Sequence, residues 1–163
     1  MDRVFAVLAH LSLEAPTVSE LTRELFISLW QAAKAGQAPA DPELARMQKF
    51  MLMHDDMHSH FERFAADPAS SMEVEGENLM LHIAMDAATE KSLELDQPSG
   101  ARQLMQGMLD AGMEPGRAFH VMSQAMMHAF LIAADEGREM DEHEYLDRAR
   151  AYAQQAQTTA PAS

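Results

Sequence analysis

Apolar and polar residues alternate along this chain with the period of an α-helix. Apolar positions recur three and four residues apart, β-branched residues are few, and prolines, glycines and capping residues interrupt the pattern at intervals. These interruptions predict six or seven helices. Their approximate ranges are 4–13, 17–36, 41–65, 77–95, 99–111, 114–135 and 141–156.

Several predicted helix ends carry residues that satisfy free backbone groups. Thr17-Val18-Ser19-Glu20 is a capping box, in which the threonine hydroxyl and the glutamate carboxylate accept hydrogen bonds from amides at the helix start. Asp41-Pro42 begins the next helix, with aspartate as N-cap and proline in the first turn. Asp67-Pro68 ends that helix because a residue before proline disfavours helical backbone.

Residues 66–76 form the one extended loop, and no strand pattern or internal repeat is visible. At 163 residues the chain is long enough for one hydrophobic core. We therefore predict an all-α fold, an antiparallel helical bundle, with a single domain at residues 1–157. The tail, residues 158–163, has nothing to bury and is predicted to be disordered.

The predicted helix around residues 118–134 contains no formally charged residue, which predicts that it is buried on all sides. Its polar side chains are His120, Ser123, Gln124 and His128. Residues four apart lie one turn above each other on a helix. The polarity of this helix is therefore predicted to form one stripe that points into the bundle.

Two other predicted helices carry a similar polar stripe. His82, Asp86 and Glu90 are spaced four residues apart on a face that also carries leucine and isoleucine. His54 and His58 fall on the apolar register of helix 41–65. A buried carboxylate is costly unless it is paired, hydrogen-bonded or bound to metal.

Three inward-facing stripes of this kind predict a metal site. Helical bundles hold metals with histidines and carboxylates at one-turn spacings on facing helices. The chain has no cysteine, so nitrogen and oxygen ligands are left, which suit iron, manganese or zinc. The predicted ligands are His54, His58, His82 and His120 with Asp86 and His128 nearby, and Glu90 or Gln124 to complete the shell or orient a histidine.

The same side chains have a second interpretation, a metal-free network of His–Asp hydrogen bonds that fixes the helix register. The protein would then be a structural or protein-interaction module that presents an acidic surface and dimerises through an apolar helix face. The 15 methionines serve as adaptable core residues in either case. His60 and His143 fall among charged neighbours and are predicted to take no part in a site.

The charge of the chain limits its partners. With 12 basic and 26 acidic residues the formal net charge is −14, which disfavours nucleic acid and anionic lipid. No apolar run reaches the ~18 residues of a membrane span, and the N-terminus lacks the features of a signal peptide. A cytoplasmic location is the default expectation.

From about Arg23 to Tyr152 the sequence resembles the uncharacterised bacterial proteins grouped as domain-of-unknown-function family 1841. Pieces in matching order and spacing carry the resemblance. They are Arg23-Glu24-Leu25-Phe26, Trp30, His54-Asp55-Asp56-Met57-His58, Gly76-Glu77-Asn78-Leu79-Met80-Leu81-His82, Glu90, Asp96-Gln97-Pro98-Ser99-Gly100, Ala118-Phe119-His120 and Tyr145-Leu146. The resemblance implies an α-helical fold and supplies no activity.

This chain departs from the pattern of that family at four positions. Members often carry histidine where it has Asp86 and Gly116, and glutamate where it has Gln124 and His128. Asp86 and His128 keep ligand chemistry, whereas Gly116 loses it and Gln124 weakens it. A family metal site would therefore be altered or reduced here.

These residues favour metal binding as the function. If the protein is an enzyme, it would be a non-haem iron or zinc enzyme that acts on a small substrate. Bound metal would acidify a water molecule or activate oxygen, and Glu90 would transfer the proton. The residues specify neither the reaction nor the substrate.

Overall fold

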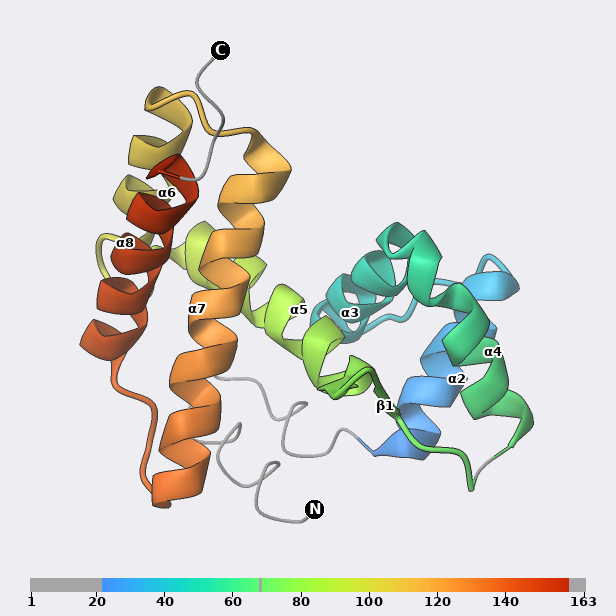
Figure 1. Cartoon of the computed structure of the whole chain (residues 1–163). Coiled ribbons are helices and arrows are strands. Elements are labelled where there is room, and N and C mark those ends of the chain that lie inside the picture. The colour runs from blue at the N-terminus through green and yellow to red at the C-terminus, as the bar shows by residue number, and fades with distance from the viewer. Residues whose placement is uncertain (1–21, 68, 159–163) are drawn as a thin grey trace. The chain divides into compact units, whose positions relative to one another are not determined.

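A computed structural model describes residues 22–67 and 69–158 of the chain (Figure 1). The predictions for a helix at 4–13, for the capping box at 17–20 and for a disordered tail at 158–163 lie outside these residues, except that Thr158 is described and ends α8. Backbone contacts divide the described chain into two compact units. The boundary falls within α5 (Leu79–Leu95), between Ala87 and Ala88.

The first unit is built from short helices and one small hairpin that lead into α5. Threonine and aspartate cap its first two helices, since Thr22 accepts a hydrogen bond from Leu25 N and Asp41 accepts one from Glu43 N. The elements are α2 (Arg23–Lys34), α3 (Pro42–Met53), the 3₁₀ turn η1 (Asp55–Met57), α4 (His58–Ala66), β1 (Glu73–Val74) and β2 (Glu77–Asn78).

Aromatic side chains form the core of this unit. Phe61 of α4 contacts Phe26 and Trp30 of α2 edge-on, with ring centroids 5.4 and 5.3 Å apart. All three rings are buried. Edge-to-face contacts of this kind add to the stabilisation that burial of the rings provides, and they fix α2 against α4.

The prediction of one unbroken helix over 41–65 is wrong, because the chain leaves helical geometry at His54. This residue ends α3 with φ −91° and ψ 70°, and α4 begins at His58 after the 3₁₀ turn. Asp55 and Asp56 give a physical reason. Carboxylates are unfavourable at the C-terminus of one helix and favourable in the first turn of the next.

The loop predicted at 66–76 contains a strand of the small hairpin, which the sequence did not predict. Val74 pairs with Glu77 across a two-residue turn, Glu75-Gly76, whose φ angles are 53° and 86°. Positive φ at both positions is what a type I′ turn requires, and glycine adopts it without strain. Strands of two residues are too short to show a period of two.

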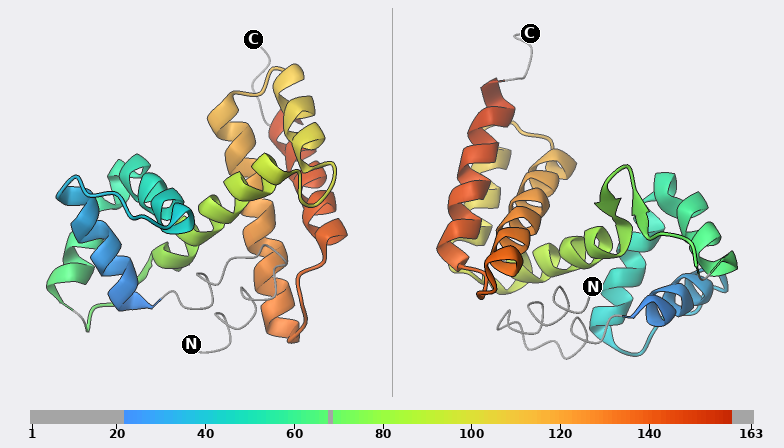
Figure 2. Two further views of the ribbon diagram at one scale, coloured as in Figure 1. Left: turned by 180° about the vertical axis from the view of Figure 1, so that it is seen from behind. Right: turned by 60° about the horizontal axis from the view of Figure 1, so that its bottom comes forward.

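The second unit consists of the end of α5 followed by α6 (Ala101–Asp110), α7 (Pro115–Glu136) and α8 (Glu142–Thr158). Figures 1 and 2 show α7 and α8 side by side and antiparallel. Arg117 at the start of α7 donates a hydrogen bond to the carbonyl of Ala156 near the end of α8. The seven α-helices confirm the predicted all-α fold, and none of those described is long and apolar enough to cross a membrane.

The prediction that the uncharged helix is buried on all sides is wrong. Within its unit α7 buries one face, which includes Met122 and Ala129, and leaves His120, Gln124 and Leu131 exposed. Lack of charge does not require burial, because histidine and glutamine side chains are readily solvated.

Gly107 provides a test of the helical packing in the second unit. It lies in the middle of α6, and an added Cβ would meet no atom within 4 Å. We expect Gly107→Ala to raise the free energy of unfolding by about 0.5 to 1 kcal/mol, measured by urea denaturation, because alanine loses less backbone entropy on folding. Gly112→Ala is the control and should destabilise, since Gly112 has φ +83°.

Candidate metal centre

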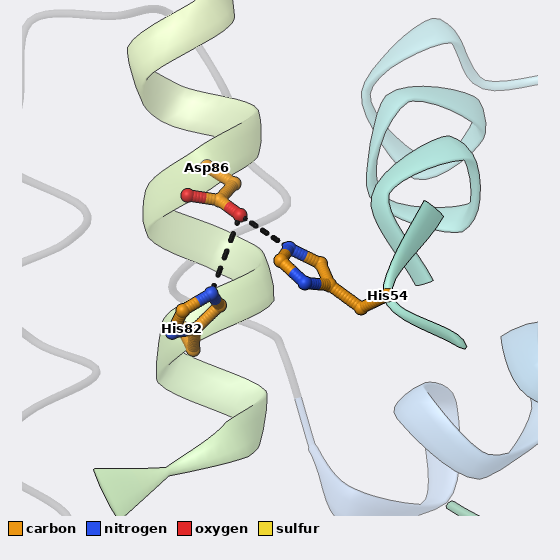
Figure 3. A group of neighbouring side chains, drawn as sticks. All are labelled: His54, His82 and Asp86. Carbon is orange, nitrogen blue, oxygen red and sulfur yellow. Dashed lines mark hydrogen bonds and ion pairs between the residues drawn. The ribbon is translucent and has the colours of Figure 1, made fainter. Parts of the chain in front are cut away.

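Three side chains of the first unit lie together, His54, His82 and Asp86 (Figure 3). One ligand atom from each lies within 4.8 Å of the other two. His54 Nε2 is 2.8 Å from Asp86 Oδ2, and His82 Nε2 is 3.5 Å from the same oxygen. The two imidazole rings meet nearly edge to face, with centroids 4.9 Å apart. Both histidines therefore present Nε2 to one carboxylate.

The local backbone explains how these residues meet. His82 and Asp86 are one turn apart on α5, so their side chains share a face of the helix. His54 comes from the break between α3 and η1, where its non-helical backbone carries the ring toward α5 (Figure 3). The break that the sequence did not predict is the feature that supplies this ligand.

Asp86 is the buried centre of the group. Its side chain is 7% exposed, compared with 14% for His82 and 27% for His54. A carboxylate in such surroundings needs compensating partners. The two imidazoles provide them, and the exposure of His54 leaves an opening to solvent on its side.

Glu77 contacts the group from the hairpin and was not among the predicted ligands. Its Oε1 accepts a hydrogen bond from His82 Nδ1 at 2.5 Å. Burial by itself lowers the pKa of His82, but the hydrogen bonds and charges of Asp86 and Glu77 outweigh it and raise that pKa to about 9. Glu77 precedes His82 by five residues, a spacing that would put the two side chains on different faces of the predicted helix 77–95. It reaches His82 because Glu77 lies in β2 and α5 begins only at Leu79.

His58 belongs to a different set of contacts. Its Nε2 donates to the backbone carbonyl of Met51 at 3.0 Å, and its ring packs on Trp30 with centroids 4.7 Å apart. The indole Nε1 of Trp30 in turn donates to Glu62. The structure thus places His58 against Trp30 at the edge of the aromatic core, and the group of His54, His82 and Asp86 does not include it.

The remaining predicted ligands, Glu90, His120 and His128, lie in the second unit. His120 is exposed there, while Glu90 and His128 are half-buried. Nδ1 of His128 is hydrogen-bonded to the hydroxyl of Tyr152 at 2.6 Å. Their participation in a site with the residues around Asp86 stays a prediction. Of the two histidines expected to take no part, His143 is exposed and His60 is half-buried.

The family model described as Domain of unknown function (DUF1841) matches residues 19–151. The chain belongs to this family. The match spans His54, Glu77, His82 and Asp86, and it confirms the resemblance drawn from the sequence motifs. No curated protein and no solved structure matches the chain.

The donor set of this DUF1841 protein fits a transition metal. Two imidazole nitrogens and one carboxylate oxygen are ligands that zinc, iron and manganese accept. Bonds of about 2.0 to 2.1 Å in a tetrahedral site place ligand atoms roughly 3.4 Å apart. The 3.5 Å separation of His82 and Asp86 matches this value, and the 2.8 Å separation of His54 and Asp86 requires a small widening.

Proposed function

We propose that the protein binds a transition metal ion through His54 Nε2, His82 Nε2 and Asp86. The observation that carries the proposal is that one ligand atom from each of these three residues lies within 4.8 Å of the other two, around a buried carboxylate. Zinc in catalytic sites and non-haem iron are both held by three protein ligands that leave positions open. A metal held in this way would supply Lewis-acid activation of a bound water or small substrate.

The arrangement around the ligands supports this function. The side chain of Asp86 is 7% exposed, so it is shielded from competing water, whereas the side chain of His54 is 27% exposed and provides a path for the ion. His82 Nδ1 already has a carboxylate partner in Glu77. Metal-binding histidines almost always have such a partner on the second nitrogen.

A second candidate function is structural, a metal-free His–Asp network within a helical module. The observation in its favour is the 2.8 Å hydrogen bond between His54 Nε2 and Asp86, which satisfies the carboxylate without a metal. This bond joins the end of α3 to α5 and would fix their register. The raised pKa of His82 also keeps that ring cationic beside two carboxylates at neutral pH.

Chelator-dependent melting separates these functions. We expect protein purified without an affinity tag to bind Zn²⁺, Fe²⁺ or Mn²⁺, and to melt at a lower temperature in chelator. At a metal concentration 100 times the Kd the stabilisation is about 2.7 kcal/mol, or roughly 5 to 10 °C for a chain of this size. His82→Ala should abolish the difference, because it removes a ligand.

His143→Ala is the matched control, since His143 is an exposed histidine of α8. It should keep the chelator effect and change stability by less than about 0.5 kcal/mol. In the metal-free network, His82→Ala destabilises the protein equally with and without chelator, and the wild type takes up none of the three metals. Those two results together would exclude metal binding and support the structural function.

A further inference from the structure

Glu77 lies between the turn of the hairpin and the start of α5, next to the candidate metal centre. Its backbone pairs with Val74 across the tight turn of the hairpin. The next residue, Asn78, accepts a hydrogen bond from Leu81 N and so caps the first turn of α5. The hairpin and the helix cap together fix the backbone position of Glu77, and so the point from which its side chain extends.

The contact from Glu77 determines which ring nitrogen of His82 faces Asp86. The carboxylate of Glu77 accepts the Nδ1 hydrogen bond, and Nε2 of the same ring lies 3.5 Å from Asp86 Oδ2. A ring rotated about its Cβ–Cγ bond would lose the bond to Glu77. The hydrogen bond therefore holds the orientation of the ring, and it keeps the proton on Nδ1 when Nε2 gives up its own proton to bind a metal.

We propose that Glu77 is a positioning residue of the metal centre, which orients His82 and leaves its Nε2 as the metal-binding nitrogen. The inference rests on the proposed metal-binding function. Glu77 does not bind the metal, since its partner is the nitrogen on the opposite side of the ring. The side chain of Glu77 is 49% exposed, so the pair adds little as a surface ion pair and acts through ligand orientation and basicity.

The test compares Zn²⁺ affinity in full-length variants by competition with a chromophoric chelator. Glu77→Ala is expected to weaken the affinity by about 10- to 100-fold, the usual effect of losing such a partner. Glu77→Gln should lie between this variant and the wild type, because its amide oxygen can still accept from Nδ1. Glu73→Ala removes an exposed carboxylate of the same hairpin and should bind as the wild type does.

¹⁵N NMR of the histidine rings reports which nitrogen of His82 carries the proton and which binds zinc. A purely structural role of Glu77 would not change that assignment. Zinc-loaded wild type should show His82 with a slowly exchanging Nδ1 proton and zinc on Nε2, and Glu77→Ala should lose the protected proton. If the wild type binds zinc and Glu77→Ala binds it with the same affinity, the role of Glu77 is overturned and the proposed metal-binding function still stands. Equal weakening in Glu73→Ala would also overturn it, because the hairpin and not the carboxylate would then matter. A wild type that binds no zinc would overturn the proposed function together with it.

Discussion

Asp86→Ala is expected to have the largest effect of any single change in the first unit. Asp86 contacts both histidines, so its loss removes a ligand and a partner of two imidazoles. We expect Zn²⁺ affinity to fall by more than about 100-fold, beyond the 10- to 100-fold range of an indirect partner. The metal-free protein should also lose about 2 to 4 kcal/mol of unfolding free energy, since breaking a buried pair leaves uncompensated charge.

Asp86→Asn separates the effect of the side chain's shape from the effect of its charge on stability and zinc affinity. Asparagine has nearly the same size and can accept a hydrogen bond from one imidazole, so its stability loss should be smaller, while its affinity for zinc should be as low as that of Asp86→Ala. Asp55→Asn is the control, because the side chain of Asp55 is 90% exposed and follows His54 directly. Zinc affinity unchanged in Asp86→Ala, measured by chelator competition, would show that the metal is held elsewhere.

Local sequence patterns were sufficient for most of the helix ends and named His54, His82 and Asp86 as ligands, but they predicted neither the break at His54 nor the contact from Glu77. Helix ends could be predicted because proline, glycine and capping residues act locally, as the N-cap at Asp41 and the glycine after α7 show. His82 and Asp86 could be paired because residues four apart on one helix always share a face. Both predictions depend only on neighbours along the chain.

The remainder of the site depends on contacts that local patterns do not encode. The apolar register of 41–65 continues through His54, so the pattern of apolar residues does not show the break between α3 and α4. Glu77 reaches His82 from a hairpin whose strands have two residues each, too short to be recognised by periodicity. In residues 118–134 of α7 the lack of charge predicts burial, yet His120 and Gln124 are exposed.

The structure reduces the three predicted polar stripes to one candidate group of metal ligands. The sequence predicts three equivalent stripes, but among the described residues the one group of three possible metal ligands is His54, His82 and Asp86, and Glu77 contacts His82. A three-ligand group with one oriented histidine is a smaller and more specific hypothesis than a seven-residue ligand set. It also makes a definite prediction about pH, because the orienting and the ligating carboxylates flank the same imidazole.

The stability of the metal-free protein is expected to fall as pH rises from about 6.5 to about 9. The pKa of His82 is raised from 6.5 to about 9 in the folded protein. Below pH 6.5 the ring is protonated in both folded and unfolded chains, so its contribution is fully present. Between the two values the unfolded chain releases the proton first, and stability declines because the folded state binds more protons. Above pH 9 the contribution is lost.

The size of this decline and its response to metal can both be measured. A shift of this magnitude corresponds to at most about 3 kcal/mol, and the solvent around Glu77 reduces it to about 1 to 2 kcal/mol. Urea denaturation in chelator from pH 6 to 9.5 should show the decline in the wild type and in His143→Ala, and a flatter profile in His82→Gln. Because metal must displace the proton from His82, calorimetry at pH 7.5 should show about one proton released per ion bound. A wild-type profile as flat as that of His82→Gln would contradict the charged pairing of His82 with Asp86 and Glu77.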